Sequence, residues 1–80
     1  MNPNELKLKQ VLADLFDMPA EKVGDDTSPD TVSKWDSVNH LSLVLAIENA
    51  FDVSLTEEQS VEILSYPLIK AVLQEHGIKF

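Results

Sequence analysis

The sequence contains no cysteine and only two histidines among its 80 residues. Without cysteine the chain forms no disulfide and offers no thiolate to a metal ion. The two histidines, His40 and His76, lie far apart in the chain and do not match the spacing of zinc ligands. We therefore expect no metal centre, and neither a disulfide nor a thiolate metal site to stabilise the fold.

Positive charge and long apolar runs are also scarce. Lys and Arg number 6 against 14 Asp and Glu, so the formal net charge is −8 at pH 7 and the pI is about 4.4. Such a chain repels nucleic-acid phosphates and meets basic partners more readily. No apolar run approaches the roughly 18 residues of a membrane span, and no charged-then-apolar leader opens the chain. We expect a monomeric cytoplasmic protein that binds neither nucleic acid nor a membrane.

What the chain does contain is apolar residues at helical spacing. Residues 1–80 are expected to form one domain, near the lower size limit for a core that no disulfide or metal ion reinforces. No strand pattern or repeat appears, and helices are predicted over residues 3–17, within the stretch 35–51, and over residues 57–63 and 66–76. Each begins after a residue that caps helices well, namely Asn2, Asp36, Thr56 and Ser65, and Gly77 is a natural end for the last. The prediction is an all-α four-helix bundle with three main helices and a short third one.

The connection between the first two predicted helices, residues 18–34, is rich in Pro, Gly, Asp, Ser and Thr. Its apolar residues do not recur at a regular spacing. Residues 20–23 are expected to form a single turn that places Val23 in the core. A connection this long within a small domain usually has a function. Here it leads to Asp36 and Ser37, and Trp35 is expected to anchor its end.

The functional interpretation depends on Ser37. Asp36 can accept hydrogen bonds from the first-turn N–H groups of the helix, which leaves Ser37 at the first helical position. That position is exposed and close to the positive end of the helix dipole, where a phosphate ester is stabilised. Taken alone, a serine after a capping aspartate is more often a plain helix start.

A helical wheel of residues 37–51 shows two separate apolar faces. The broad face is the candidate core face and consists of Leu43, Val44, Ile47, Ala50 and Phe51. The narrow face, here called the outer stripe, consists of Val38, Leu41 and Leu45 and lies beside Ser37. Either the outer stripe faces solvent as a partner site, or it packs against another helix of the bundle.

Two other interpretations of the same residues remain open at this point. An enzyme would combine Ser37 and His40, three residues apart on one helix, with a carboxylate. The chain offers no oxyanion-hole loop and little room for a substrate pocket, so we expect no catalytic residues and no enzyme. A non-catalytic interaction module would use the outer stripe alone to bind a partner.

The Asp36-Ser37-Val38 sequence, opening an amphipathic helix after a long loop, resembles the attachment site of acyl carrier proteins. The resemblance continues through Leu43, Ile47, Glu48, Phe51 and Asp52 to the acidic Thr56-Glu57-Glu58 start of a short helix and a last helix. It covers nearly the whole chain in order and length. It implies that a phosphopantetheinyl transferase attaches 4′-phosphopantetheine covalently to Ser37, and that the arm then carries acyl groups as thioesters between enzymes.

The resemblance also implies roles for the surrounding residues. Asp36 matches the motif aspartate, which lies near the transferase's magnesium during loading. Docking to acyl-loading and acyl-using enzymes, through basic and apolar sites on those enzymes, would involve Val38, Leu41, Leu45, Glu48 and Trp35. An inter-helix acyl pocket would be lined by His40, Leu43, Ile47, Val53 and Ile63.

Two departures from the family pattern are informative. Trp35 stands where a small residue is usual, and Glu48 is the one acidic residue on a helix that has several in housekeeping fatty-acid carriers. Docking is therefore expected to depend more on apolar contact than on charge. This favours a specialised fatty-acid or secondary-metabolite pathway, such as polyketide synthesis. A peptidyl or aminoacyl carrier is the alternative within the class, although the strong acidity favours acyl cargo.

Overall fold

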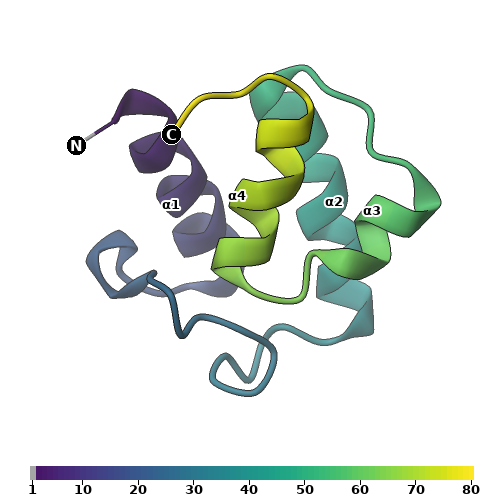
Figure 1. Cartoon of the computed structure of the whole chain (residues 1–80). Helices are drawn as coiled ribbons and strands as arrows, with labels where there is room; N and C mark the ends of the chain where they lie inside the picture. Colours follow the sequence, from purple (N-terminus) through teal and green to yellow (C-terminus); the bar gives the residue numbers. More distant parts are fainter. Residues whose placement is uncertain (1) are drawn as a thin grey trace.

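The computed structural model describes residues 2–80, and Met1 lies outside the described residues. Residues 2–80 contain four α-helices, one short 3₁₀ turn and no strand (Figure 1). The elements in chain order are α1 (Pro3–Phe16), η1 (Ala20–Lys22), α2 (Ser37–Phe51), α3 (Glu57–Glu62) and α4 (Tyr66–Glu75). The all-α prediction, with a short third helix and a long loop between the first two, is confirmed.

The helix starts follow from side-chain caps, as the sequence predicts. Each of the four predicted N-cap residues accepts a hydrogen bond from a first-turn N–H group that would otherwise have no partner. At α3 the cap is reciprocal, because Thr56 accepts from the Gln59 N–H while Gln59 accepts from the Thr56 N–H. The other three bonds run to Asn2 from Asn4, to Asp36 from Asn39 and to Ser65 from Leu68.

The ends of α1, α2 and α4 are closed by residues with left-handed backbone conformation. Gly77, at φ 87°, follows α4, and the Ile78 N–H donates to the Leu73 carbonyl at 3.0 Å. This is the predicted Schellman-type end. Aspartate takes the same conformation after α1 and α2, with φ 53° at Asp17 and 54° at Asp52, which the sequence did not indicate.

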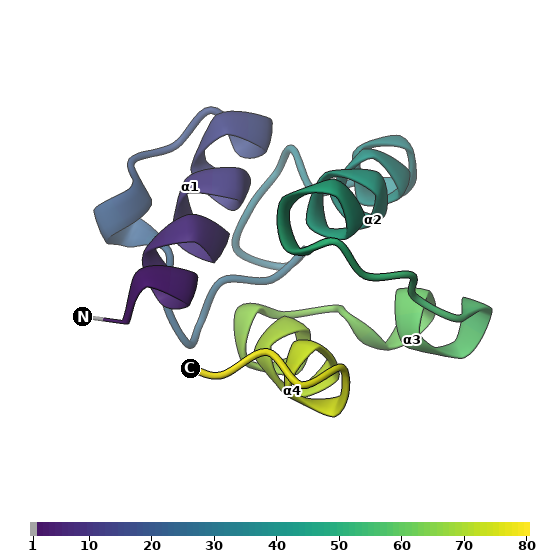
Figure 2. The ribbon, with the colours of Figure 1, turned by 90° about the horizontal axis from the view of Figure 1, so that it is seen from above.

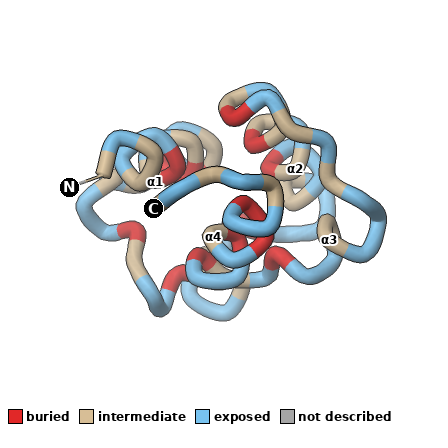
Figure 3. Tube along the Cα trace, turned by 45° about the horizontal axis from the view of Figure 1, so that its top comes forward, coloured by how far each residue is buried: buried red, intermediate tan, exposed pale blue. Residues whose placement is uncertain are grey.

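The core lies between α1, α2 and α4, whose buried stretches face one another (Figure 3). The broad face of α2 contributes Leu43 and Ile47, both fully buried, and Phe51. The predicted turn over Ala20–Lys22 places Val23 in the same cluster. By contrast, α3 has no buried residue within its bounds, and it lies at the side of the bundle away from α1 (Figure 2).

The long loop is fixed to the bundle at two points. The buried Thr27 accepts from the Gly24 N–H at 2.9 Å, and its carbonyl accepts from the Tyr66 N–H at the start of α4, also at 2.9 Å. At the end of the loop, Trp35 is buried and stacks on Phe16, with ring centroids 5.1 Å apart. The prediction that Trp35 anchors the loop is confirmed.

The two ends of the described chain lie side by side (Figure 1). The Asn4 side-chain amide donates to the Lys79 carbonyl at 3.0 Å. Phe80 packs against Phe51 at the last residue of α2. The chain ends are therefore near the C-terminal end of α2, and Ser37 is at the opposite end of that helix.

Candidate functional site

Ser37 is the first residue of α2, and it is exposed. Asp36 caps the helix by accepting the Asn39 N–H at 2.9 Å, and its own carbonyl accepts from the His40 N–H. Within residues 2–80 no hydrogen bond engages the Ser37 hydroxyl. A free hydroxyl at a positively polarised helix end, with the cap supplied by its neighbour, is accessible to an enzyme that esterifies it.

The outer stripe of α2 faces solvent. Val38, Leu41 and Leu45 are 74%, 67% and 62% exposed. The alternative in which this stripe packs inside the bundle is therefore wrong. The fold leaves three large apolar side chains uncovered beside Ser37, as partner-binding surfaces do.

A groove of about 560 Å³ opens beside Ser37 and is here called the Ser37 groove. Leu41 of α2, Val61 of α3 and Leu64 just after α3 provide its apolar walls. Val61 and Leu64 are 65% and 51% exposed, so they extend the apolar surface of the outer stripe across to α3. The remaining lining residues are Pro29, Trp35, Asp36, Ser37 and His40.

His40 lies in the Ser37 groove, but both of its ring nitrogens are engaged away from Ser37. The Trp35 indole N–H donates to His40 Nδ1 at 3.0 Å, and His40 Nε2 is 2.6 Å from the Ser60 carbonyl of α3. An indole N–H only donates and a carbonyl only accepts, so the ring is neutral with its proton on Nε2. The ring therefore offers no free nitrogen to take the Ser37 proton.

Two residues of the expected docking set are placed differently from the outer stripe. Trp35 is only 4% exposed, so its side chain supports the Ser37 groove from beneath, and direct contact with a partner does not fit this burial. Glu48 is half-buried, and its Oε2 accepts the Leu55 N–H at 2.8 Å. Glu48 thus holds the link between α2 and α3, a local contact that spacing along one helix does not reveal.

The expected inter-helix acyl pocket is occupied by packed side chains. Leu43, Ile47 and Ile63 are fully buried members of one core cluster, and Val53 packs against it. Of the five residues predicted for the pocket, His40 alone lines the Ser37 groove. Pro29, Val61 and Leu64 were missed because they come from segments distant in the sequence, with no common period.

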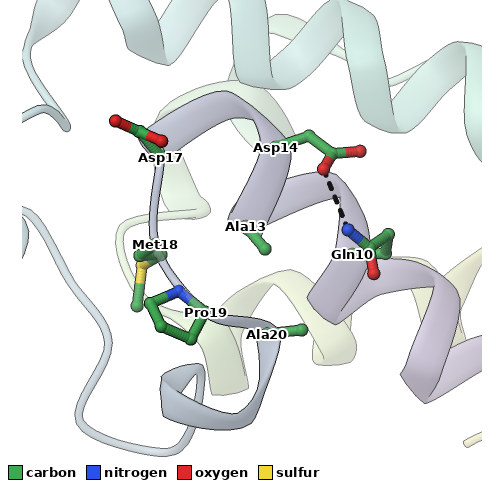
Figure 4. A pocket seen from close by; sticks show the side chains of 7 residues that line it. All are labelled: Gln10, Ala13, Asp14, Asp17, Met18, Pro19 and Ala20. Atoms are coloured by element: carbon green, nitrogen blue, oxygen red, sulfur yellow. Dashed lines mark hydrogen bonds between the residues drawn. The ribbon is translucent and has the colours of Figure 1, made fainter.

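A second hollow, of about 550 Å³, lies at the end of α1 and has a different character. Asp14 and Asp17 line it together with Met18 and Pro19, and Asp14 accepts a hydrogen bond from Gln10 (Figure 4). Asp17 also pairs with Lys34 at 3.3 Å. Both carboxylates already have partners from the chain, and neither is near Ser37 in sequence.

Positive charge is unevenly distributed along the chain. No lysine or arginine occurs from residue 35 to residue 69, which spans α2 and α3. Lysines gather instead over aromatic rings near α1 and α4, with Lys7 over Phe51 at 4.9 Å and Lys70 over Tyr66 at 5.4 Å. The segment that carries Ser37 is therefore acidic and apolar, and Lys34, which directly precedes it, is paired with Asp17 at 3.3 Å.

Residues 2–80 hold no cluster of three or more His, Asp and Glu side chains able to bind a metal ion. No helix in this part of the chain is both long enough and apolar enough to cross a bilayer. A scan against protein-family models finds no match to this chain, and neither does a search of curated proteins.

Proposed function

We propose that this protein is an acyl carrier that bears 4′-phosphopantetheine on Ser37 and passes thioester-bound acyl groups between enzymes. One observation carries the proposal. The Ser37 hydroxyl is exposed at the first position of a 15-residue helix, after a long loop, and Asp36 rather than Ser37 supplies the cap. Because Asp36 supplies the cap, the Ser37 hydroxyl is left available for esterification.

The residues present suit a phosphodiester at Ser37. Loading would join Ser37 Oγ to a phosphorus atom of coenzyme A, break the pyrophosphate bond and release adenosine 3′,5′-bisphosphate. The hydroxyl proton would pass to a base of the transferase, because both nitrogens of His40 are engaged elsewhere. The attached arm supplies a thiol that holds acyl groups as thioesters. The helix N-terminus then faces the phosphate charge favourably.

The all-helical order of the chain is consistent with a carrier bundle. A long first helix, a long loop, the Ser37 helix, a short helix and a last helix follow one another as the resemblance to acyl carrier proteins implies. The uncovered outer stripe supplies the apolar surface that docking to partner enzymes requires.

We further propose a specialised carrier rather than a housekeeping one. Glu48 is the one acidic residue of α2, and its carboxylate is engaged by the Leu55 N–H. The outer stripe therefore presents apolar side chains with little charge of its own. Partners would recognise it mainly by apolar contact, with weaker electrostatic steering from the acidic residues of α3.

The test is enzymatic loading followed by intact mass measurement. The protein is incubated with coenzyme A, magnesium and a broad-specificity phosphopantetheinyl transferase. We expect a mass gain of one phosphopantetheine in the wild-type chain and none in Ser37→Ala. Ser42→Ala is the matched control, because Ser42 is also exposed on α2 and should leave loading unchanged. No gain with several transferases would refute the carrier.

The interaction module is the second candidate, and the exposed outer stripe favours it equally. It predicts that incubation with the transferase gives no mass gain. It also predicts that partner binding does not depend on Ser37. A peptidyl or aminoacyl carrier predicts the same gain as an acyl carrier. Those two are separated by offering the loaded protein to acyl-transferring and amino-acid-activating enzymes and measuring which thioester forms.

A further inference from the structure

The short helix α3 is held in place by polar contacts and by the apolar residues on either side of it, Leu55 and Ile63. It has six residues, none of them buried, and so short a helix is not stable in water by itself. Both histidines of the chain contact it: His40 Nε2 at the Ser60 carbonyl, 2.6 Å away, and His76 Nε2 at the Gln59 side-chain oxygen, 2.9 Å away. Its position therefore depends on these hydrogen bonds and on the buried Ile63 that follows it.

His40 joins α3 to the part of the chain that precedes Ser37. Its Nδ1 accepts from the buried Trp35, and Trp35 in turn stacks on Phe16 of α1. The His40 ring is therefore fixed in the orientation that points Nε2–H at Ser60. Trp35 and His40 therefore connect the core to α3 through continuous contacts.

The same residues form the Ser37 groove. His40 and Trp35 line it together with Leu41, and α3 contributes Val61. A displacement of α3 would move Val61 and Leu64 relative to Ser37. The surface that an incoming enzyme meets beside Ser37 is thus set by the position of α3.

We propose that His40 is a positioning residue: its Nε2–H holds α3 against the Ser37 end of α2, and Trp35 orients its ring for that purpose. His40 acts on Ser37 through the shape of the groove and does not take part in bond making. This inference rests on the proposed function for its kinetic part, while its structural part stands without it.

The structural test is amide hydrogen exchange of α3 compared with α1 in His40 variants. His40→Asn is too short to reach Ser60 and should raise α3 exchange about tenfold, the effect of one lost hydrogen bond of about 1.4 kcal/mol. His40→Gln can still donate to Ser60 and should restore protection to within about threefold of wild type, the loss of ring stacking accounting for the remainder. Ser42→Ala, an exposed change on the same helix, is the control and should leave α3 exchange unchanged.

A second variant tests the role of Trp35. Trp35→Phe keeps an aromatic ring on Phe16 but removes the N–H donor to His40. It should raise α3 exchange more than α1 exchange, because the lost N–H donor faces His40 while the aromatic contact with Phe16 of α1 is kept. A role in packing alone would raise exchange equally in both helices.

The kinetic test is the loading reaction at Ser37. His40→Asn should raise the KM of the protein for the transferase about tenfold while kcat changes less than about twofold, and His40→Gln should recover most of the KM. Equal exchange changes in α1 and α3, or an unchanged KM in His40→Asn, would overturn the positioning role. Absence of loading in wild type would instead refute the proposed function and leave the exchange result to decide the structural part.

Discussion

The two apolar faces of α2 differ in what they contact. Leu43 and Ile47 on one face are fully buried against α1 and α4. Val38, Leu41 and Leu45 on the other are at least 62% exposed. The first face accounts for the fold, since burial of apolar area is the main favourable contribution to folding. The second contributes little to stability, and its exposure beside Ser37 is what the proposed partner binding would require.

The largest difference expected between the faces is in stability. Ile47→Ala should lower the free energy of unfolding by about 2–5 kcal/mol, because it leaves a cavity in the core. Leu45→Ala should change it by less than about 0.5 kcal/mol. Urea unfolding followed by circular dichroism measures both. If Ile47→Ala does not fold, Ile47→Val should still lower the free energy by about 0.5–1.5 kcal/mol, and equal values for the two faces would refute the comparison.

The reverse difference is expected in partner binding. Leu41→Asp should leave the unfolding transition nearly unchanged and raise the KM for the transferase about tenfold, since an apolar contact is replaced by a charge in a desolvated interface. Asn49→Asp, which adds the same charge at another exposed position of α2, is the control and should keep the wild-type KM. A Leu41→Asp protein that unfolds would show that the outer stripe belongs to the core.

The buried Tyr66 should make the protein less stable at alkaline pH. Burial, together with the Glu5 carboxylate 3.4 Å from its hydroxyl, raises the pKa of Tyr66 above its usual range. A raised pKa in the folded state favours the neutral phenol, so this contribution is complete below about pH 10, the ordinary tyrosine value, and is lost as the pH rises above it. Thermal melting from pH 8 to pH 11 should show the loss, and Tyr66→Phe should reduce it.

The smallest effect concerns the end of α2. Asp52 has a left-handed backbone and stands at the negative end of the helix dipole. Asp52→Gly should raise the free energy of unfolding by about 0.5–1 kcal/mol, because glycine adopts this conformation without strain and carries no charge. Loading at Ser37, at the other end of the helix, should be unaffected. A stabilised variant with altered loading would show that the two ends are coupled.

Local signals in the sequence predicted the elements and the position of Ser37. Caps such as Asp36 and Thr56 act on N–H groups two or three residues away, so the helix starts could be read directly from the chain. Helical spacing likewise separated Leu43 and Ile47 from Leu41. The exposed serine at the start of α2 followed from the same two rules.

Contacts between distant segments could not be read in this way. The His40–Ser60 bond joins two helices, and the Glu48–Leu55 bond joins a helix to a loop. Neither hydrogen bond is marked in the sequence by a regular apolar spacing or by a capping residue. The Trp35 ring was expected both to anchor the loop and to meet partners, and only its burial against Phe16 distinguishes the two. Tertiary packing decided these cases.

The pairing of the chain ends has a practical use. Phe80 contacts Phe51, the last residue of α2, and the Asn4–Lys79 hydrogen bond brings the start of α1 to the same region, so both ends of the described residues lie near this end of α2. Ser37 begins the same 15-residue helix, which at about 1.5 Å per residue separates the two regions by roughly 22 Å. A purification tag, a solid support or a fused domain attached at either end would leave the serine pointing away from it. The domain could also be circularly permuted, with the old ends joined by a short linker and new ones opened in the loop before Trp35.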